Sequence, residues 1–171
     1  MRKFLWSLFE VFETVAVAVI VVFVIRTFLI QPFLVSGASM EPNFSEGNYL
    51  LVDELTYRFR DPVREEVVVF RSPTGRDYFI KRIIGMPGEE VVIQDGKVFV
   101  SGKLLEENYL YGEKTPMDIS LKLGPDQYFV LGDNRGHSFD SRSWGPLELG
   151  KIVGVVRLRL WPLNKVEAFG L

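Results

Sequence analysis

A serine hydroxyl and a lysine amine are the two side chains of this chain that together could hydrolyse an amide. Ser39 ends a run of small residues that begins at Ser36, and small residues leave its hydroxyl unshielded. Lys81 lies in Asp77–Ile84, a stretch that is mostly apolar on both faces of an extended strand, where burial favours loss of the ammonium proton. A neutral amine is a competent general base for a serine hydroxyl, so this pair predicts nucleophilic catalysis.

A polar segment, Leu131–Gly145, could support that chemistry, because it concentrates side chains that hydrogen-bond in both directions. Paired, hydrogen-bonded charges can fix a loop of this kind. The charged residues are Asp133, Arg135, Asp140 and Arg142, and two serines, Ser138 and Ser141, add hydroxyl groups. Each segment also has a plain structural interpretation: a linker around Ser39, a lysine that reaches solvent or pairs with Asp77, and a solvated surface loop.

The composition excludes several other kinds of site. The chain has 171 residues, a formal net charge of -2, no cysteine and one histidine, His137. Without cysteine there is no disulfide, thiol nucleophile or Cys-ligated zinc, and one histidine rules out His-cluster metal sites. A net charge near zero gives no general electrostatic case for nucleic acid. We therefore expect no metal, no cofactor and no nucleic-acid partner.

Alternation of apolar and polar residues predicts that strands position these groups. Turn residues such as Asp95-Gly96 and Ser101-Gly102 separate the shorter runs, as in hairpins. The expected fold is mainly β, a compact catalytic domain resembling a β-barrel or sandwich, with no long helix after the N-terminal region. The expected strands are Asn48–Val52, Glu66–Phe70, Asp77–Ile84, Glu90–Ile93, Lys97–Val100, Gln127–Leu131 and Ile152–Leu160.

The N-terminal region predicts a single transmembrane helix. Val15–Ile25 is uninterrupted and apolar, and Arg26 near its end can reach the lipid headgroups. Arg2 and Lys3 favour a cytoplasmic N-terminus. We expect residues 1–31 to form the cytoplasmic N-terminus and the anchor, and residues 32–171 an extracytoplasmic β-rich domain of a single-pass membrane protein. A cleavable signal peptide and a buried core helix are the alternatives.

Three motifs in order give the chain a specific resemblance. They are Ser39-Met40-x-Pro42 after the apolar run, Lys81–Glu89 (KRIIGMPGE), and Gly132–Arg142 (GDNRGHSFDSR). The chain resembles bacterial type I signal peptidases, the leader peptidase family, over nearly its whole length. The resemblance implies a membrane-anchored serine endopeptidase that cuts signal peptides from exported preproteins after small residues, with a Ser/Lys dyad on a β fold.

The resemblance also implies roles for individual residues. Ser39 corresponds to the nucleophile, Lys81 to the general base, and Ser138 to the serine that orients the lysine amine. Some members place a serine of the oxyanion hole where this chain has Gly37, so the donors to the oxyanion are open between the Ser39 backbone N–H, Ser36 and Gly37. By the same resemblance, the residues that support the polar loop are Asp133, Arg135, Asp140 and Arg142. The residues expected to line the substrate pockets are Phe33, Val35, Met40, Phe44 and Ile80.

Three other functions compete with this interpretation. A triad of Ser39, His137 and an aspartate would be cramped, because His137 and its candidate aspartates share one loop. Self-cleaving repressor-type peptidases share the dyad, but they lack an apolar anchor. A non-enzymatic membrane-anchored β-domain that binds or scaffolds partners would leave the combination of serine, lysine and polar loop without a use.

Overall fold

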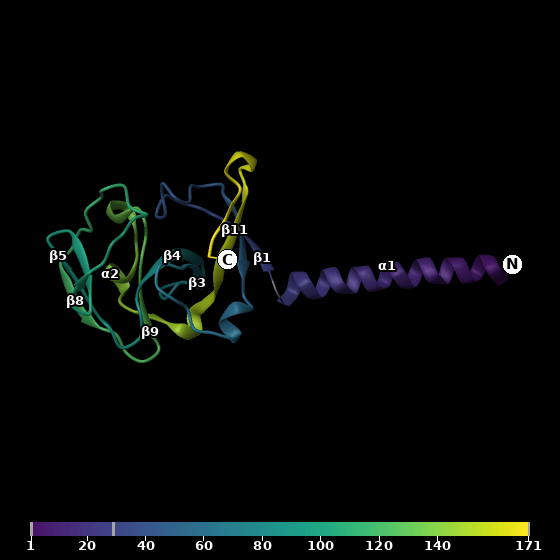
Figure 1. Cartoon of the computed structure of the whole chain (residues 1–171), viewed down its shortest axis with the longest axis horizontal. Coiled ribbons are helices and arrows are strands. Elements are labelled where there is room, and N and C mark those ends of the chain that lie inside the picture. Colours follow the sequence, from purple (N-terminus) through teal and green to yellow (C-terminus); the bar gives the residue numbers. More distant parts are fainter. Residues whose placement is uncertain (1, 29, 171) are drawn as a thin grey trace.

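The computed structural model describes residues 2–28 and 30–170; the side chains of residues 2–5, 7–8, 23–28 and 30 lie outside that description. Helix α1, Arg2–Phe28, is followed by two antiparallel sheets. Figure 1 shows α1 projecting as one rod from the β-rich part of the chain. The polar and catalytic candidates named above all lie after this helix.

The large sheet has eight strands in the order β1-β2-β11-β3-β4-β9-β10, with β12 paired to β11. Lys81 lies on β4, between β3 and β9. A second, four-stranded sheet has the order β7-β6-β5-β8. The strands of the large sheet are β1 (Ile30–Leu34), β2 (Tyr49–Asp53), β3 (Val67–Arg71), β4 (Tyr78–Gly85), β9 (Gln127–Leu131), β10 (Leu147–Glu148), β11 (Ile152–Trp161) and β12 (Glu167–Ala168). Those of the small sheet are β5 (Glu90–Gln94), β6 (Lys97–Val100), β7 (Lys103–Leu104) and β8 (Ile119–Lys122).

All seven expected strands are present, with ends shifted by at most one residue. Asp95-Gly96 joins β5 to β6, and Ser101-Gly102 joins β6 to β7, with both residues of each turn at positive φ as a tight hairpin requires. The mainly β prediction is confirmed, but its barrel alternative is wrong within the described residues. The end strands of each sheet are not paired with each other, so both sheets are open.

Short elements and β1 are additions that the sequence pattern did not predict. Strand β1 spans the boundary drawn between residues 31 and 32, because it pairs with β2 along its whole length. The polar loop contains a short helix, α2 (Ser141–Trp144), capped by the Asp140 carboxylate, which accepts from the Arg142 N–H. A helix one turn long has no hydrophobic period for a sequence pattern to detect.

Apolar side chains fill both faces of the large sheet. Val67 and Val69 of β3 pack on one face, while Val68 and Phe70 pack on the other. A third cluster joins the small sheet to the ends of β4 and β9, where Ile84 is fully buried. A strand buried on both faces is held rigidly, so β4 can present a polar group at a fixed position.

The N-terminal helix exposes most of its described side chains, including Trp6, Phe9 and Val22, which argues against a buried core helix. Among the residues that the structure describes, no helix has the length and apolarity needed to cross a membrane. The interpretations of Arg2, Lys3 and Arg26 rest on side chains outside the described set.

Candidate active site

Ser39 and Lys81, which are 42 positions apart, meet at hydrogen-bond distance. Lys81 Nζ donates to Ser39 Oγ over 2.7 Å and to the Ile80 carbonyl oxygen over 2.9 Å. Ser39 lies in the turn that leads from β1 to β2, and Lys81 lies in the middle of β4. The sheet therefore joins the two groups that the sequence analysis singled out.

Lys81 is a buried cation with an unusual environment. Its residue is 4% exposed, and no salt bridge to it is found within the described part of the chain. Burial lowers the pKa of Lys81 to about 8, although the charges of Asp140 and Asp133 act to raise it. A substantial fraction of the amine is thus neutral near physiological pH, with a lone pair available to accept the Ser39 proton.

An apolar cavity of about 120 Å³ opens beside the Ser39–Lys81 pair. Such a volume is far below the ~300–1,000 Å³ of sites for drug-sized ligands, and it suits small side chains. The cavity is lined by Phe33, Leu34, Val35, Ser36, Ser39, Leu50, Val69, Tyr78, Phe79, Ile80 and Lys81.

Three of the five expected substrate-pocket residues, Phe33, Val35 and Ile80, line this cavity. Met40 and Phe44 do not; they are 0% and 1% exposed and pack in the core beneath it. Their part in the substrate pockets stays a prediction. The turn after Ser39 folds inward, as the hydrogen bond from Phe44 N–H to the Met40 carbonyl oxygen shows.

The polar loop is held by a buried ion pair of its own. Arg142 donates to both oxygens of Asp140, over 2.8 and 2.7 Å. Asp140 also accepts from the Gly132 N–H over 3.1 Å, which closes the loop on itself. Burial would raise the pKa of Asp140, but the hydrogen bonds and charge of Arg142 bring it below its ordinary value.

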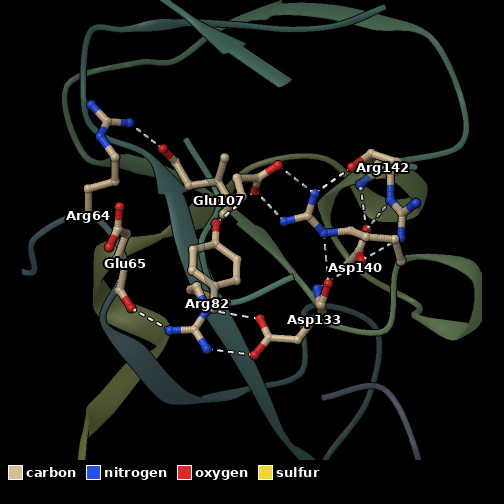
Figure 2. Close-up of polar contacts among 12 residues, drawn as sticks. Arg64, Glu65, Arg82, Glu107, Asp133, Asp140 and Arg142 are labelled. Atoms are coloured by element: carbon tan, nitrogen blue, oxygen red, sulfur yellow. Dashed lines mark hydrogen bonds and ion pairs between the residues drawn. The ribbon is translucent and has the colours of Figure 1, made fainter. Parts of the chain in front are cut away.

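The other two charges of the loop find partners elsewhere, contrary to the expected pairing within the loop. Asp133 receives two hydrogen bonds from Arg82 of β4, and Arg135 pairs with Glu107 from the connection between β7 and β8. Figure 2 shows these ion pairs and the Asp140–Arg142 pair. The loop is therefore tied to β4 and to the connection between β7 and β8.

Ser138 and Ser141 differ in what their hydroxyl groups contact. Ser141 Oγ accepts from the buried Val130 N–H over 3.0 Å, so this hydroxyl satisfies a backbone donor of β9. Ser138 Oγ is buried and makes no hydrogen bond of standard geometry among the described residues, although it helps to lower the pKa of Asp140; its expected bond to Lys81 is not formed. A Cβ atom at Gly132 would lie 2.2 Å from Ser138 Oγ and 2.4 Å from the Ser39 carbonyl oxygen, so only glycine fits between them.

Two of the three oxyanion candidates, Ser36 and Ser39, line the cavity. The third, Gly37, adopts a φ of +89°, which favours glycine. In the described part of the chain, the backbone N–H of Ser39 makes no hydrogen bond, so it is available to an incoming group.

Among the described residues, His137 makes no hydrogen bond to Ser39 or Lys81. Its Nδ1 is 3.3 Å from Asn134 Oδ1, and Ser39 is bonded to Lys81 instead. The contacts therefore give no support to a serine–histidine triad. Among the described residues, no group of three or more potential metal-ligating side chains converges.

Sequence reasoning missed four contributors to the site: Asn43, Arg82, Glu107 and Asn134. Asn134 and Arg82 lie inside the quoted motifs, so the motifs pointed to their neighbourhood although no role was assigned. Asn43 donates to Asp133 over 2.9 Å, and Glu107 reaches Arg135 from 28 positions away. Nothing in the local pattern around Glu107 distinguishes it from a solvated acidic residue.

Comparison with known proteins agrees with this geometry. The family described as signal peptidase, peptidase S26, matches residues 8–161. The probable signal peptidase I-2 of Synechocystis is 42% identical over 164 residues, covering 92% of this chain and 75% of that protein. Signal peptidase I V of Bacillus subtilis is 36% identical over 170 residues, covering 91% of this chain and 98% of that protein.

A solved structure extends the likeness to the fold. The crystal structure of a signal peptidase I from Enterococcus faecalis has a TM-score of 0.52 and 33% sequence identity, covering 56% of this chain and 97% of that one. The family match over most of the chain sets aside a non-enzymatic scaffold. This chain belongs to the S26 family of signal peptidases and is a serine peptidase.

Proposed function

We propose that the chain cleaves signal peptides from exported preproteins after small residues, with Ser39 as nucleophile and neutral Lys81 as general base. One observation carries the proposal: Lys81 Nζ lies 2.7 Å from Ser39 Oγ, buried and without a salt bridge among the described residues. When the amine is neutral, this hydrogen bond reverses and the Ser39 hydroxyl donates to it.

The steps follow from these groups. Ser39 Oγ attacks the scissile carbonyl carbon while its proton passes to Lys81. The resulting ammonium donates that proton to the leaving amine as the C–N bond breaks, and an acyl ester on Ser39 remains. Water then attacks the ester, with Lys81 again accepting a proton, which releases the acid and restores the serine.

The oxyanion of each tetrahedral intermediate needs donors close to Ser39. The Ser39 N–H is our first candidate, because it has no partner among the described residues. Ser36 and Gly37 are candidates for the second donor, and Ser36 lines the cavity. The small apolar cavity supports a preference for small side chains next to the cut.

Ser138 is the group that we propose to orient Lys81. Its hydroxyl is buried and is not bonded to Lys81, and it helps to lower the pKa of Asp140. A hydrogen bond with the amine during the reaction would restrict the direction of the lysine lone pair. Asp140 and Arg142 support the loop that carries this serine.

A direct assay tests the proposal. The full chain in detergent is incubated with a precursor that carries alanine at the first and third positions before the cut, and the product's new N-terminus is sequenced. We expect cleavage after the second alanine and no cleavage by Ser39→Ala. Equal activity of Ser39→Ala would remove Ser39 from the mechanism.

We further propose that helix α1 anchors the enzyme in the membrane, with the N-terminus in the cytoplasm and residues 32–171 outside. The apolar run Val15–Ile25 supports this, and its last three residues lie outside the side chains that the structure describes. The family match begins at residue 8 and includes that run, and the family is membrane-associated. Protease added outside spheroplasts is expected to degrade the β domain. Protection of that domain until lysis would contradict this orientation.

A further inference from the structure

We propose that Asn134 is a positioning residue that aims the Ser39 backbone N–H at the oxyanion. The inference rests on the proposed function and assigns a role to a side chain that the catalytic steps do not use. Asn134 Nδ2 donates to the Ala38 carbonyl oxygen over 3.0 Å, although the two residues are 96 positions apart.

The Ala38 carbonyl and the Ser39 N–H belong to one rigid peptide unit. The cis bonds of the described residues precede Pro42 and Pro162, so the Ala38–Ser39 bond is trans. In a planar trans peptide the C=O and N–H groups point in opposite directions. A side chain that holds the Ala38 carbonyl therefore fixes the direction of the Ser39 N–H, which has no partner of its own in the described residues.

Asn134 also holds the peptide unit on the other side of the nucleophile. Its backbone N–H donates to the Ser39 carbonyl oxygen over 3.1 Å. The two carbonyls that flank the Ser39 Cα are thus bound by one residue. Glu41 N–H is a second, longer donor to Ala38, at 3.2 Å, so loss of the asparagine side chain weakens the hold without abolishing it.

His137 supplies the contact that orients the asparagine amide. Asn134 Oδ1 lies 3.3 Å from His137 Nδ1, which leaves Nδ2 directed at Ala38. Asn134 itself has φ -79° and ψ 82°, a backbone conformation outside the left-handed region, so alanine or aspartate can replace it without backbone strain.

Two variants of the full chain in detergent test the role. Asn134→Ala loses the donor, and Asn134→Asp keeps the shape but sets an acceptor against the Ala38 carbonyl. Removing an oxyanion donor outright costs about 10²–10³ in kcat, and Glu41 remains, so we expect about tenfold loss in kcat for Asn134→Ala. We expect a larger loss for Asn134→Asp, KM and unfolding temperature close to wild type, and a smaller loss for His137→Ala.

A pair of peptide ligands separates positioning from general damage. Ser39 Oγ adds to the C=O of a peptide aldehyde ending in alaninal, forming a hemiacetal whose oxygen occupies the oxyanion position. The matching peptide alcohol cannot form this bond. We expect Asn134→Ala to weaken binding of the aldehyde by the same factor by which it lowers kcat, and to leave binding of the alcohol unchanged. Exposed Ser143, whose side chain makes no hydrogen bond within the described residues, gives the matched loop control, Ser143→Ala.

Three results would overturn the role of Asn134. They are full kcat in both variants, equal weakening of aldehyde and alcohol, or a kcat loss confined to a shifted pH profile, which would place the effect on Lys81. Failure of the underlying mechanism is distinguishable, because in that case Ser39→Ala would itself retain activity.

Discussion

The two faces of strand β4 carry neighbouring cations that the fold treats in opposite ways. Lys81 is buried and has no salt-bridge partner among the described residues, and burial lowers its pKa to about 8. Arg82, the next residue, faces the opposite side of the sheet and donates to both oxygens of Asp133. Its Cζ atom lies 4.1 Å from the centroid of the Tyr109 ring. Figure 2 shows the Arg82–Asp133 pair.

The difference separates a charge that holds structure from a charge that must be lost in the mechanism proposed above. A guanidinium stays protonated and binds a carboxylate through two parallel hydrogen bonds, so it ties the loop to the strand. An ammonium in an apolar site loses its proton far more readily. Strand alternation lets both occur at successive positions without placing a carboxylate directly on Lys81.

Exchanging lysine and arginine at positions 81 and 82 should reveal the difference between them most strongly, as a difference in cleavage rate. Lys81→Arg keeps a fixed positive charge at the position of the base, so we expect at least about a 10³-fold loss of kcat/KM. Arg82→Lys keeps a positive charge beside Asp133 but loses the two parallel hydrogen bonds that tie the loop to β4, so we expect a loss of stability and a loss of activity well below that of Lys81→Arg. Cleavage rates on the same precursor measure both. Near-normal activity of Lys81→Arg would contradict a neutral base.

Filling the gap between the loop and the nucleophile should have the next largest effect. In Gly132→Ala the new Cβ would lie 2.2 Å from Ser138 Oγ and 2.4 Å from the Ser39 carbonyl oxygen. Displacement of reacting groups by about 1 Å can cost about 10²-fold, and we expect a kcat loss of that size. Gly136→Ala is the matched control, since no atom lies within 4 Å of its added Cβ. Equal kinetics for the two variants would contradict the tight packing inferred here.

The two serines of the loop should separate rate from stability. Ser138→Ala removes the proposed orienting hydroxyl, and we expect at least about a tenfold loss of kcat with normal stability. Ser141→Ala leaves the buried Val130 N–H without its acceptor, and we expect a loss of about 1–3 kcal/mol in unfolding free energy with a smaller effect on rate. Denaturation and cleavage assays on both variants measure this. The reverse pattern would exchange their roles.

The last expected effect concerns stability at alkaline pH. The pKa of Lys81 rises from about 8 in the folded chain to 10.5 on unfolding, so between these values the unfolded chain binds more protons. Wild-type stability should gain from this group as pH rises through that window, by up to about 3 kcal/mol. Lys81→Met lacks the gain, so its stability advantage should be greatest below pH 8 and shrink toward pH 10.5. An advantage independent of pH, from denaturation of both proteins, would contradict the lowered pKa.

The sequence allowed the strands to be predicted, and it pointed to Ser39 and Lys81, because both leave local signals. Runs rich in β-branched and aromatic residues over Gln127–Leu131 and Lys97–Val100 predicted those strands with their observed ends. Ser39 and Lys81 were identified through short motifs around each of them, and their contact follows once β4 is placed beside the Ser39 turn.

The partners of the loop charges were not predictable, because ion pairing depends on tertiary distance. Within Gly132–Arg142 the nearest opposite charges suggested local pairs, yet only Asp140 and Arg142 pair inside it. Glu107 and Arg82 reach the loop from other elements. Likewise, offset from the nucleophile alone could not show that Met40 and Phe44 turn into the core.

The pH dependence of kcat/KM tests the central claim most directly. If neutral Lys81 is the base, activity on the alanine-bearing precursor should fall as the pH drops through about 8, because the amine becomes protonated. The same limb should persist in His137→Ala. A limb that lies near the ordinary histidine pKa of about 6.5 and disappears in His137→Ala would contradict the Ser39–Lys81 mechanism.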